Sequence, residues 1–245
     1  MDNELLRRHD GHITHLTLNR PHKANALSAS LVEALINAVE YAYTDDTRLL
    51  VIDGGGGNFC AGFDFADYQD ASDGDLVLRF IRIEHLLQQV YHAPYATLAL
   101  VHGRNFGAGA DIFCACAARI ADPGASFRLP GLRFGLALGT RRLARRIGTD
   151  AARALLATSD TFDAVQALRI HFATEVAPRA SWPETIAAAT CAAQSLTPSA
   201  LARMNEQTTA DTRAADMLAL VESASVPGLK ERIRIFREKT TQERT

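Results

Sequence analysis

Hydrophobic and polar positions change their period along the chain, and this change predicts strands that alternate with helices. Residues 5–9 and 13–18 lie on either side of Asp10-Gly11, and in the second segment Leu16 and Leu18 alternate with Thr17. This pattern is typical of a β-hairpin with a two-residue turn. After Ser28 the apolar residues recur every three or four positions, which predicts a helix with Ser28 as its N-cap.

The alternation of strands and helices continues through the middle of the chain and then stops. Residues 49–52 are fully apolar and residues 95–101 largely so, and both segments predict buried strands. The pattern predicts helices over 75–91 and 107–118. No strand signal remains from residue 183 onward. The helices predicted there span residues 183–195, 198–209, 211–223 and 228–239, with breaks at Pro198 and at Pro227-Gly228.

Length and composition fit a soluble protein with one main core. The chain has 245 residues, of which 47% are hydrophobic and 22% are charged. We divide it into an α/β body, residues 1–182, and a helical region, residues 183–245. The net charge of −2 argues against a nucleic-acid partner, and no apolar run is long enough to span a membrane. A cytoplasmic location is expected.

Cysteines and histidines do not predict a metal site. The four cysteines are too few for a disulfide framework and are interpreted as small hydrophobic residues of a reducing compartment. Histidines occur at positions 9, 12 and 15, but in a strand His12 faces away from the other two. We expect no metal ion.

Two segments rich in small residues follow the apolar strands, at residues 59–64 (FCAGFD) and 103–111 (GRNFGAGAD). Residues without a large side chain let a ligand approach the backbone closely. The second segment is predicted to begin a helix, where free N–H groups and the helix dipole favour a negative charge. The segments therefore predict an anion or oxyanion site, with glycines that only serve packing as the alternative.

Together with three further motifs, these segments resemble the crotonase (enoyl-CoA hydratase/isomerase) superfamily over nearly the whole chain. The motifs are NRPHKANALS (19–28), FCAGFDF (59–65), HGRNFGAGADI (102–112), FRLPGLRFGL (127–136) and PGLKERIRIFREK (227–239). The resemblance implies an α/β spiral of ββα units with a C-terminal helical region used in trimerisation. It also implies an acyl-CoA substrate, a homotrimer or dimer of trimers, and no cofactor beyond the coenzyme A moiety.

The resemblance assigns roles by position. The N–H groups of Phe63 and Ala108 would form an oxyanion hole that stabilises the enolate of the thioester, and Asp111 would transfer protons. An aspartate in the first turn of a helix is equally well explained as a partner of the helix dipole. The positions that would bind coenzyme A are Lys23, Ala24, Ala26, Ala61, Gly62, Asp64, Phe65, Phe236 and Lys239.

The sequence departs from the family pattern at its second acid. The position of the second glutamate of the hydratases is Gly131, and the loop that follows is about three residues shorter than usual. Because hydration requires a second group for proton transfer, we expect an isomerase or a lyase of the decarboxylase type. The alternative is a catalytically weak or inactive acyl-CoA-binding paralogue.

Two groups of arginines have open interpretations. Arg128 and Arg133 flank Gly131 in the sequence and form either a clamp for an acyl carboxylate or a solvated pair. A further set is predicted to form a solvated helix face, with coenzyme A phosphates or a partner subunit as less favoured contacts. This set comprises Arg141, Arg142, Arg145 and Arg146.

Overall fold

The computed structural model describes residues 3–242, which contain a six-stranded sheet and a smaller three-stranded one. The strand order of the large sheet is β1-β2-β3-β4-β6-β9, and that of the small sheet is β5-β7-β8. The large sheet consists of β1 (Leu5–Asp10), β2 (Ile13–Leu18), β3 (Leu49–Gly54), β4 (Ala96–Val101), β6 (Ala118–Ala121) and β9 (Glu175–Val176). The small sheet consists of β5 (Arg104–Phe106), β7 (Ser126–Arg128) and β8 (Phe162–Asp163).

The predicted hairpin is confirmed. Strands β1 and β2 are antiparallel, and Asp10 pairs with Ile13 next to the turn. The remaining neighbours in the large sheet are parallel, as expected where helices connect successive strands.

Helices follow most strands. They are α1 (Ala29–Ala42), α2 (Asp73–Tyr91), α3 (Ala108–Ala115), α4 (Thr140–Ile147), α5 (Thr149–Thr158), α6 (Ala164–Arg169), α7 (Trp182–Gln194), α8 (Pro198–Thr208), α9 (Arg213–Ala224) and α10 (Leu229–Gln242). The predicted cap of α1 is confirmed, because the Ser28 hydroxyl accepts a hydrogen bond from the Leu31 N–H at 3.1 Å. Short 3₁₀ helices span Pro21–Lys23, Gly131–Phe134 and Arg179–Ser181.

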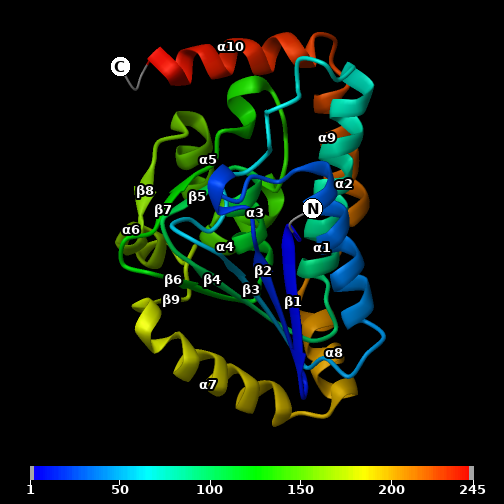
Figure 1. Ribbon diagram of the computed structural model, residues 1–245, viewed down its shortest axis with the longest axis vertical. Helices are drawn as coiled ribbons and strands as arrows, with labels where there is room; N and C mark the ends of the chain where they lie inside the picture. The colour runs from blue at the N-terminus through cyan, green and yellow to red at the C-terminus, as the bar shows by residue number, and fades with distance from the viewer. Residues whose placement is uncertain (1–2, 243–245) are drawn as a thin grey trace.

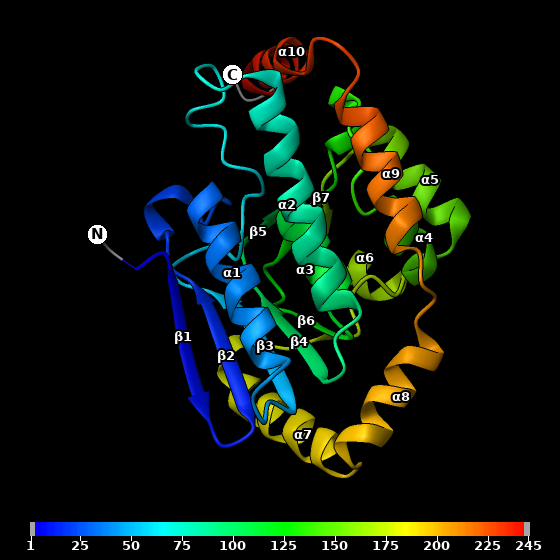
Figure 2. The same cartoon turned by 90° about the vertical axis from the view of Figure 1, so that its right-hand side faces the viewer.

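The large sheet is covered on both faces, which explains why the first four residues of β3 are all apolar. Leu50 and Ile52 belong to the main core, which includes residues of α1 and α2. Leu49 and Val51 point to the opposite face and belong to a second cluster that includes Trp182 of α7. Figures 1 and 2 show α1 and α2 on one side of the sheet and α7 on the other.

The C-terminal helices agree with the predicted ones to within a few residues, and α10 lies at the end of the molecule opposite α7 (Figure 1). Helix α10 contacts the 3₁₀ helix Gly131–Phe134 and α2. No helix in the described part of the chain combines the length and apolar character needed to cross a membrane.

Candidate active site

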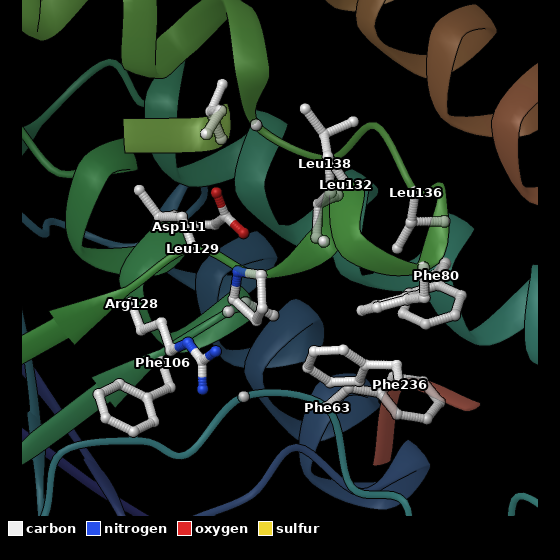
Figure 3. Close-up of a pocket in the computed structure, with 18 of the residues that line it drawn as sticks. Phe63, Phe80, Phe106, Asp111, Arg128, Leu129, Leu132, Leu136, Leu138 and Phe236 are labelled. Atoms are coloured by element: carbon white, nitrogen blue, oxygen red, sulfur yellow. The ribbon is translucent and has the colours of Figure 1, made fainter. Parts of the chain in front are cut away.

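A cavity of about 280 Å³ lies between the loop after β3, the start of α3 and helix α10 (Figure 3). The apolar side chains that line it are Phe63, Phe65, Phe80, Phe106, Leu129, Leu132, Phe134, Leu136, Leu138, Leu143, Leu156 and Phe236. Among the described residues, its charged lining groups are Asp111, Arg128 and Arg237. A mostly apolar wall with a few polar groups is typical of a small-molecule binding site.

Two backbone segments meet at the cavity because glycine stands where a side chain would not fit. Gly62 has φ of +90°, and a Cβ built there would lie 2.5 Å from the carbonyl oxygen of Phe106. A Cβ on Gly109 would lie 2.5 Å from the carbonyl oxygen of Cys60. The two segments rich in small residues are therefore in direct contact, as close backbone approach requires.

The loop after β3 leaves one amide facing no protein acceptor. The Leu27 N–H donates to the Gly62 carbonyl at 2.7 Å, and the Asp64 N–H donates to the Leu27 carbonyl at 3.1 Å. Between these two bonds lies Phe63, whose N–H donates to no other group among residues 3–242. Phe63 also lines the cavity, so its amide is available to a ligand.

A second free amide comes from the start of α3. Gly107 precedes the helix with φ of +51° and offers no side-chain cap, while its own N–H donates to the Arg128 carbonyl at 2.8 Å. Ala108 is the first helical residue, and its N–H has no acceptor in the described part of the protein. A Cβ on Gly62 would lie 3.4 Å from this nitrogen. Two free donors and a helix N-terminus therefore border one cavity, which suits a negatively charged oxygen.

Asp111 is buried beside these amides, on the first turn of α3 (Figure 3). Its side chain makes no hydrogen bond to the described residues, and only 5% of the residue is exposed. Burial raises the pKa of Asp111 to about 8; Arg142 opposes this rise and Glu84 adds to it. The carboxyl lies against Gly139, where a Cβ would be 2.2 Å from Oδ1. Asp111 is thus mainly a neutral acid at pH 7.

Behind the cavity, Arg142 forms a buried ion pair that the sequence did not predict. Its guanidinium donates to both carboxylate oxygens of Glu84, at 2.9 and 2.5 Å, and lies 3.5 Å from Asp216. Arg142 is 2% exposed and Glu84 is 1% exposed. The predicted solvated helix face is therefore wrong for Arg142, because its partners come from α2 and α9, far away in the sequence.

The second acid position of the hydratases is occupied by backbone alone. Gly131 lines the cavity, and its carbonyl accepts the Leu136 N–H at 2.9 Å. A Cβ at position 131 would lie 3.0 Å from the Leu136 carbonyl oxygen, so a side chain would require this loop to shift. Asp111 is the single carboxylic acid among the described lining residues.

The structure separates the two arginines that flank Gly131 in sequence. Arg128 lines the cavity next to Phe106, and its Nε donates to the Ser159 carbonyl at 2.8 Å. Arg133 is exposed, does not line the cavity, and its guanidinium donates to the Thr158 carbonyl. A clamp formed by both arginines inside the cavity does not match this arrangement.

The positions assigned to coenzyme A belong to three segments, residues 23–26, residues 61–65 and helix α10. The Ala61 N–H donates to the Ala24 carbonyl at 2.9 Å. This hydrogen bond joins the segment of residues 61–65 to that of residues 23–26. Ala61, Gly62, Phe65 and Phe236 line the cavity, whereas Ala26 is buried. Lys23 and Lys239 are exposed and are not lining residues.

Asp64 has a partner that explains its burial. Its Oδ2 accepts a hydrogen bond from Arg20 at 2.9 Å, and its Oδ1 accepts the Ala66 N–H at 3.0 Å. Burial opposes ionisation, but these hydrogen bonds and the charge of Arg20 leave the pKa of Asp64 below its usual value. Asp64 therefore supports the loop as an anion.

Asn25 is a supporting residue that the sequence motifs did not single out. It adopts a left-handed conformation with φ of +54°, which asparagine tolerates better than most residues. Its side chain accepts the Arg20 N–H at 2.7 Å and donates to the carbonyls of Gly55 and Asn58 at 2.9 and 2.8 Å. It thereby joins the loop of residues 20–25 to the loop of residues 55–58, which precedes Ala61. Its place in the NRPHKANALS motif was the available signal.

His9, Asp45 and Asp46 form a surface group outside this cavity, with ligand-type atoms within 4.8 Å of one another. The two carboxylates already pair with neighbours, since Arg7 lies 3.2 Å from Asp45 and His12 lies 3.1 Å from Asp46. This arrangement is explained by charge pairing alone.

Comparison with known proteins identifies the family. The sequence profile of the enoyl-CoA hydratase/isomerase family matches residues 8–242. The chain belongs to the enoyl-CoA hydratase/isomerase family. A crystal structure from Bordetella parapertussis, provisionally designated an enoyl-CoA hydratase/isomerase, is 49% identical with a TM-score of 0.94 and covers 95% of this chain and 98% of that one. The predicted crotonase fold is thus confirmed.

Curated members of the enoyl-CoA hydratase/isomerase family are more distant. A probable enoyl-CoA hydratase of Mycobacterium leprae is 34% identical over 168 residues, or 66% of each protein. An enoyl-CoA isomerase/hydratase of Mycosarcoma maydis is 31% identical over 179 residues, covering 68% of this chain and 65% of that protein. The matched regions thus span just under two thirds of the length of these two relatives.

Proposed function

We propose that this family member binds an acyl-CoA thioester and stabilises its enolate between the N–H groups of Phe63 and Ala108. The observation that carries the proposal is the pair of free amides at one cavity, contributed by segments that are far apart in the sequence. A donor of this kind acts on the charge that develops during reaction and contributes about 3 kcal/mol of transition-state stabilisation. No cofactor beyond the coenzyme A moiety takes part in the proposed reaction.

Asp111 is the proposed proton donor. Its pKa of about 8 keeps it protonated at pH 7, and its position three residues after Ala108 directs the side chain back toward the start of the helix. A neutral acid in this place can deliver a proton to the α-carbon of an enolate held by the two amides.

The proposed reaction is a lyase or isomerase reaction rather than hydration. Hydration needs one group to activate water and another to complete the proton transfer, and Asp111 is the single acid among the described lining residues. In decarboxylation of a malonyl-type thioester, the bond between Cα and the carboxylate breaks and carbon dioxide leaves. The electron pair passes to the thioester oxygen, and Asp111 then protonates Cα. Water restores the proton on Asp111.

Coenzyme A is proposed to lie along residues 24–26 and 61–65, with Phe236 of α10 at the opposite wall. The hydrogen bond between Ala61 and Ala24 aligns the first two segments, and the exposed Lys23 and Lys239 are available to phosphates. We also propose that the protein forms a homotrimer or a dimer of trimers, as its resemblance to the crotonase superfamily implies.

Replacing Ala108 by proline tests the oxyanion assignment. Proline removes the N–H but is tolerated at the first position of a helix, and Gly107 before it is not in the helical region that proline disfavours. We expect turnover of malonyl-CoA or 3-enoyl-CoA to fall by about a hundredfold or more. Thr149→Pro is the matched control, because Thr149 is exposed, begins α5 and also follows a glycine with positive φ. Unchanged turnover in folded Ala108→Pro would contradict the proposal.

The pH dependence distinguishes the two reactions. Decarboxylation uses protonated Asp111, so its rate should be level below the pKa of about 8 and fall above it. Isomerisation of a 3-enoyl thioester begins with proton removal by ionised Asp111, so its rate should increase as the pH rises through about 8. Rates measured from pH 6 to pH 9 with both substrates decide between them, and hydration of crotonyl-CoA as the fastest reaction would contradict both.

A second candidate function is acyl-CoA binding with little or no turnover. Gly131 is the observation that favours it, because the position has no side chain and little room for one. Calorimetric binding of crotonyl-CoA, 3-enoyl-CoA and malonyl-CoA, followed by product analysis, separates the candidates. Tight binding without product from any of the three would support the binding protein.

A further inference from the structure

The start of helix α4 forms a polar patch in an otherwise apolar part of the cavity. Gly139 and Thr140 both line the cavity, and so do Leu138 and Leu143 on either side of them. The Thr140 hydroxyl is buried and has no hydrogen-bond partner in the described part of the chain. An unpaired buried hydroxyl is costly, so a ligand atom that pairs with it gains affinity.

The backbone of the same helix adds further donors. Gly139 caps α4 without a side-chain hydrogen bond, and the amides of Thr140, Arg141 and Arg142 have no acceptor among residues 3–242. The first amides of a helix and its dipole favour an oxygen that carries negative charge. This start of α4 is therefore rich in donors and lacks acceptors for them.

Asp111 connects this patch to the proposed reaction site. The residue is 5% exposed, and its carboxyl makes no hydrogen bond to the described residues and touches Gly139 at the cap of α4. Because Asp111 lies on the same helical turn as Ala108, the patch is close to the place where the thioester carbonyl would bind. An oxygen on C3 of the acyl group, two carbons from the thioester carbonyl carbon, would reach it.

We propose that Thr140 and the start of α4 bind a hydrogen-bond-accepting oxygen on C3 of the acyl group, so that the preferred substrates are 3-oxoacyl or malonyl-type thioesters. This inference rests on the proposed binding of an acyl-CoA thioester and names the substrate class of that site. Thr140 is a specificity-determining residue, and Leu138 and Leu143 beside it provide no side-chain acceptor. A plain aliphatic acyl group would leave the hydroxyl and the amides without partners.

The experiment compares ligands that differ in the group at C3 of the acyl chain. Dissociation constants for 3-oxobutanoyl-CoA, malonyl-CoA and butanoyl-CoA are measured by calorimetry with the wild type, Thr140→Val and Thr140→Ser. Valine keeps the shape of threonine without the hydroxyl, and serine keeps the hydroxyl. Thr185→Val is the control, because Thr185 lies on α7 outside the cavity and its hydroxyl donates to the Ser181 carbonyl.

We expect Thr140→Val to weaken the binding of 3-oxobutanoyl-CoA or malonyl-CoA by about five- to tenfold and the binding of butanoyl-CoA by less than about twofold. Thr140→Ser should retain the preference, and Thr185→Val should behave as the wild type. A larger loss for malonyl-CoA than for 3-oxobutanoyl-CoA would identify the bound oxygen as a carboxylate. Equal losses for all ligands, or none for any, would overturn the role of Thr140 while leaving acyl-CoA binding intact. Failure of the wild type to bind any of the thioesters would overturn the proposed function itself.

Discussion

Asp111→Asn should stabilise the protein at neutral pH, because the carboxyl is buried without a hydrogen bond. The pKa of Asp111 is raised from 3.8 to about 8 in the folded state. A pKa difference of one unit corresponds to about 1.4 kcal/mol. Above pH 4 the unfolded chain ionises this group, whereas the folded chain keeps it protonated up to about pH 8. The contribution of Asp111 to stability is therefore complete below pH 4 and is lost as the pH rises to 8.

The magnitude follows from that interval. Between pH 5 and pH 7 the wild type should lose about 3 kcal/mol of unfolding free energy through this group, whereas the asparagine of the variant cannot titrate. The variant should therefore gain about 3 kcal/mol relative to the wild type over these two pH units. Urea unfolding at pH 5, 6, 7 and 8 measures this difference, and groups that titrate equally in both proteins cancel.

Asp64→Asn provides a control with the opposite sign. Hydrogen bonds and Arg20 lower the pKa of Asp64, so its contribution to stability is present at neutral pH and is lost as the pH falls below about 4. This variant should be less stable than the wild type at pH 7. Parallel stability curves for the wild type and Asp111→Asn from pH 5 to pH 7 would refute the reasoning about Asp111, and so would a difference that grows toward low pH.

Two further substitutions, each with a control, test the packing of Gly139 against Asp111 and the buried ion pair of Arg142. Gly139→Ala places a Cβ 2.2 Å from the Asp111 carboxyl and should lower kcat by at least about tenfold. The control Gly148→Ala, at similar positive φ with nothing within 4 Å, should cost stability alone, so equal kcat in both variants would contradict this steric role. Arg142→Gln leaves buried carboxylates without a counter-charge and should cost about 3–5 kcal/mol in urea unfolding. Arg141→Gln, on the same helix but half-exposed, should cost less than about 1 kcal/mol, and a similar loss in both arginine variants would argue against the buried ion pair.

Local patterns predicted most of the fold because they depend on neighbours in the sequence. The hairpin of β1 and β2, the cap at Ser28 and the breaks before α8 and α10 all follow from turn, cap and period signals. The two-residue strands β8 and β9 carry no such signal, because they are too short for a period and form through pairing with distant strands.

The site was predictable to the extent that backbone groups compose it. Phe63, Ala108 and Asp111 were placed by motif, and the structure brings all three to one cavity. The burial of Arg142 was not predictable, because its partner Glu84 is 58 residues away and a run of arginines on a helix is usually solvated. Arg133 likewise depends on a contact with the distant Thr158 carbonyl.

Glu84 and Asp111 are both buried, but they differ in whether a basic side chain pairs with them. Glu84 is buried with Arg142 bound to both of its oxygens, and this pairing supports the fold. Asp111 is buried without such a partner, so it remains protonated and can give a proton but seldom take one at pH 7. With the two free amides of Phe63 and Ala108, the site is suited to a substrate in which negative charge reaches the thioester oxygen first and protonation follows. In the proposed reaction, loss of carbon dioxide generates this charge without a base, whereas addition of water to an enoyl thioester gives the same enolate only after a base has activated the water.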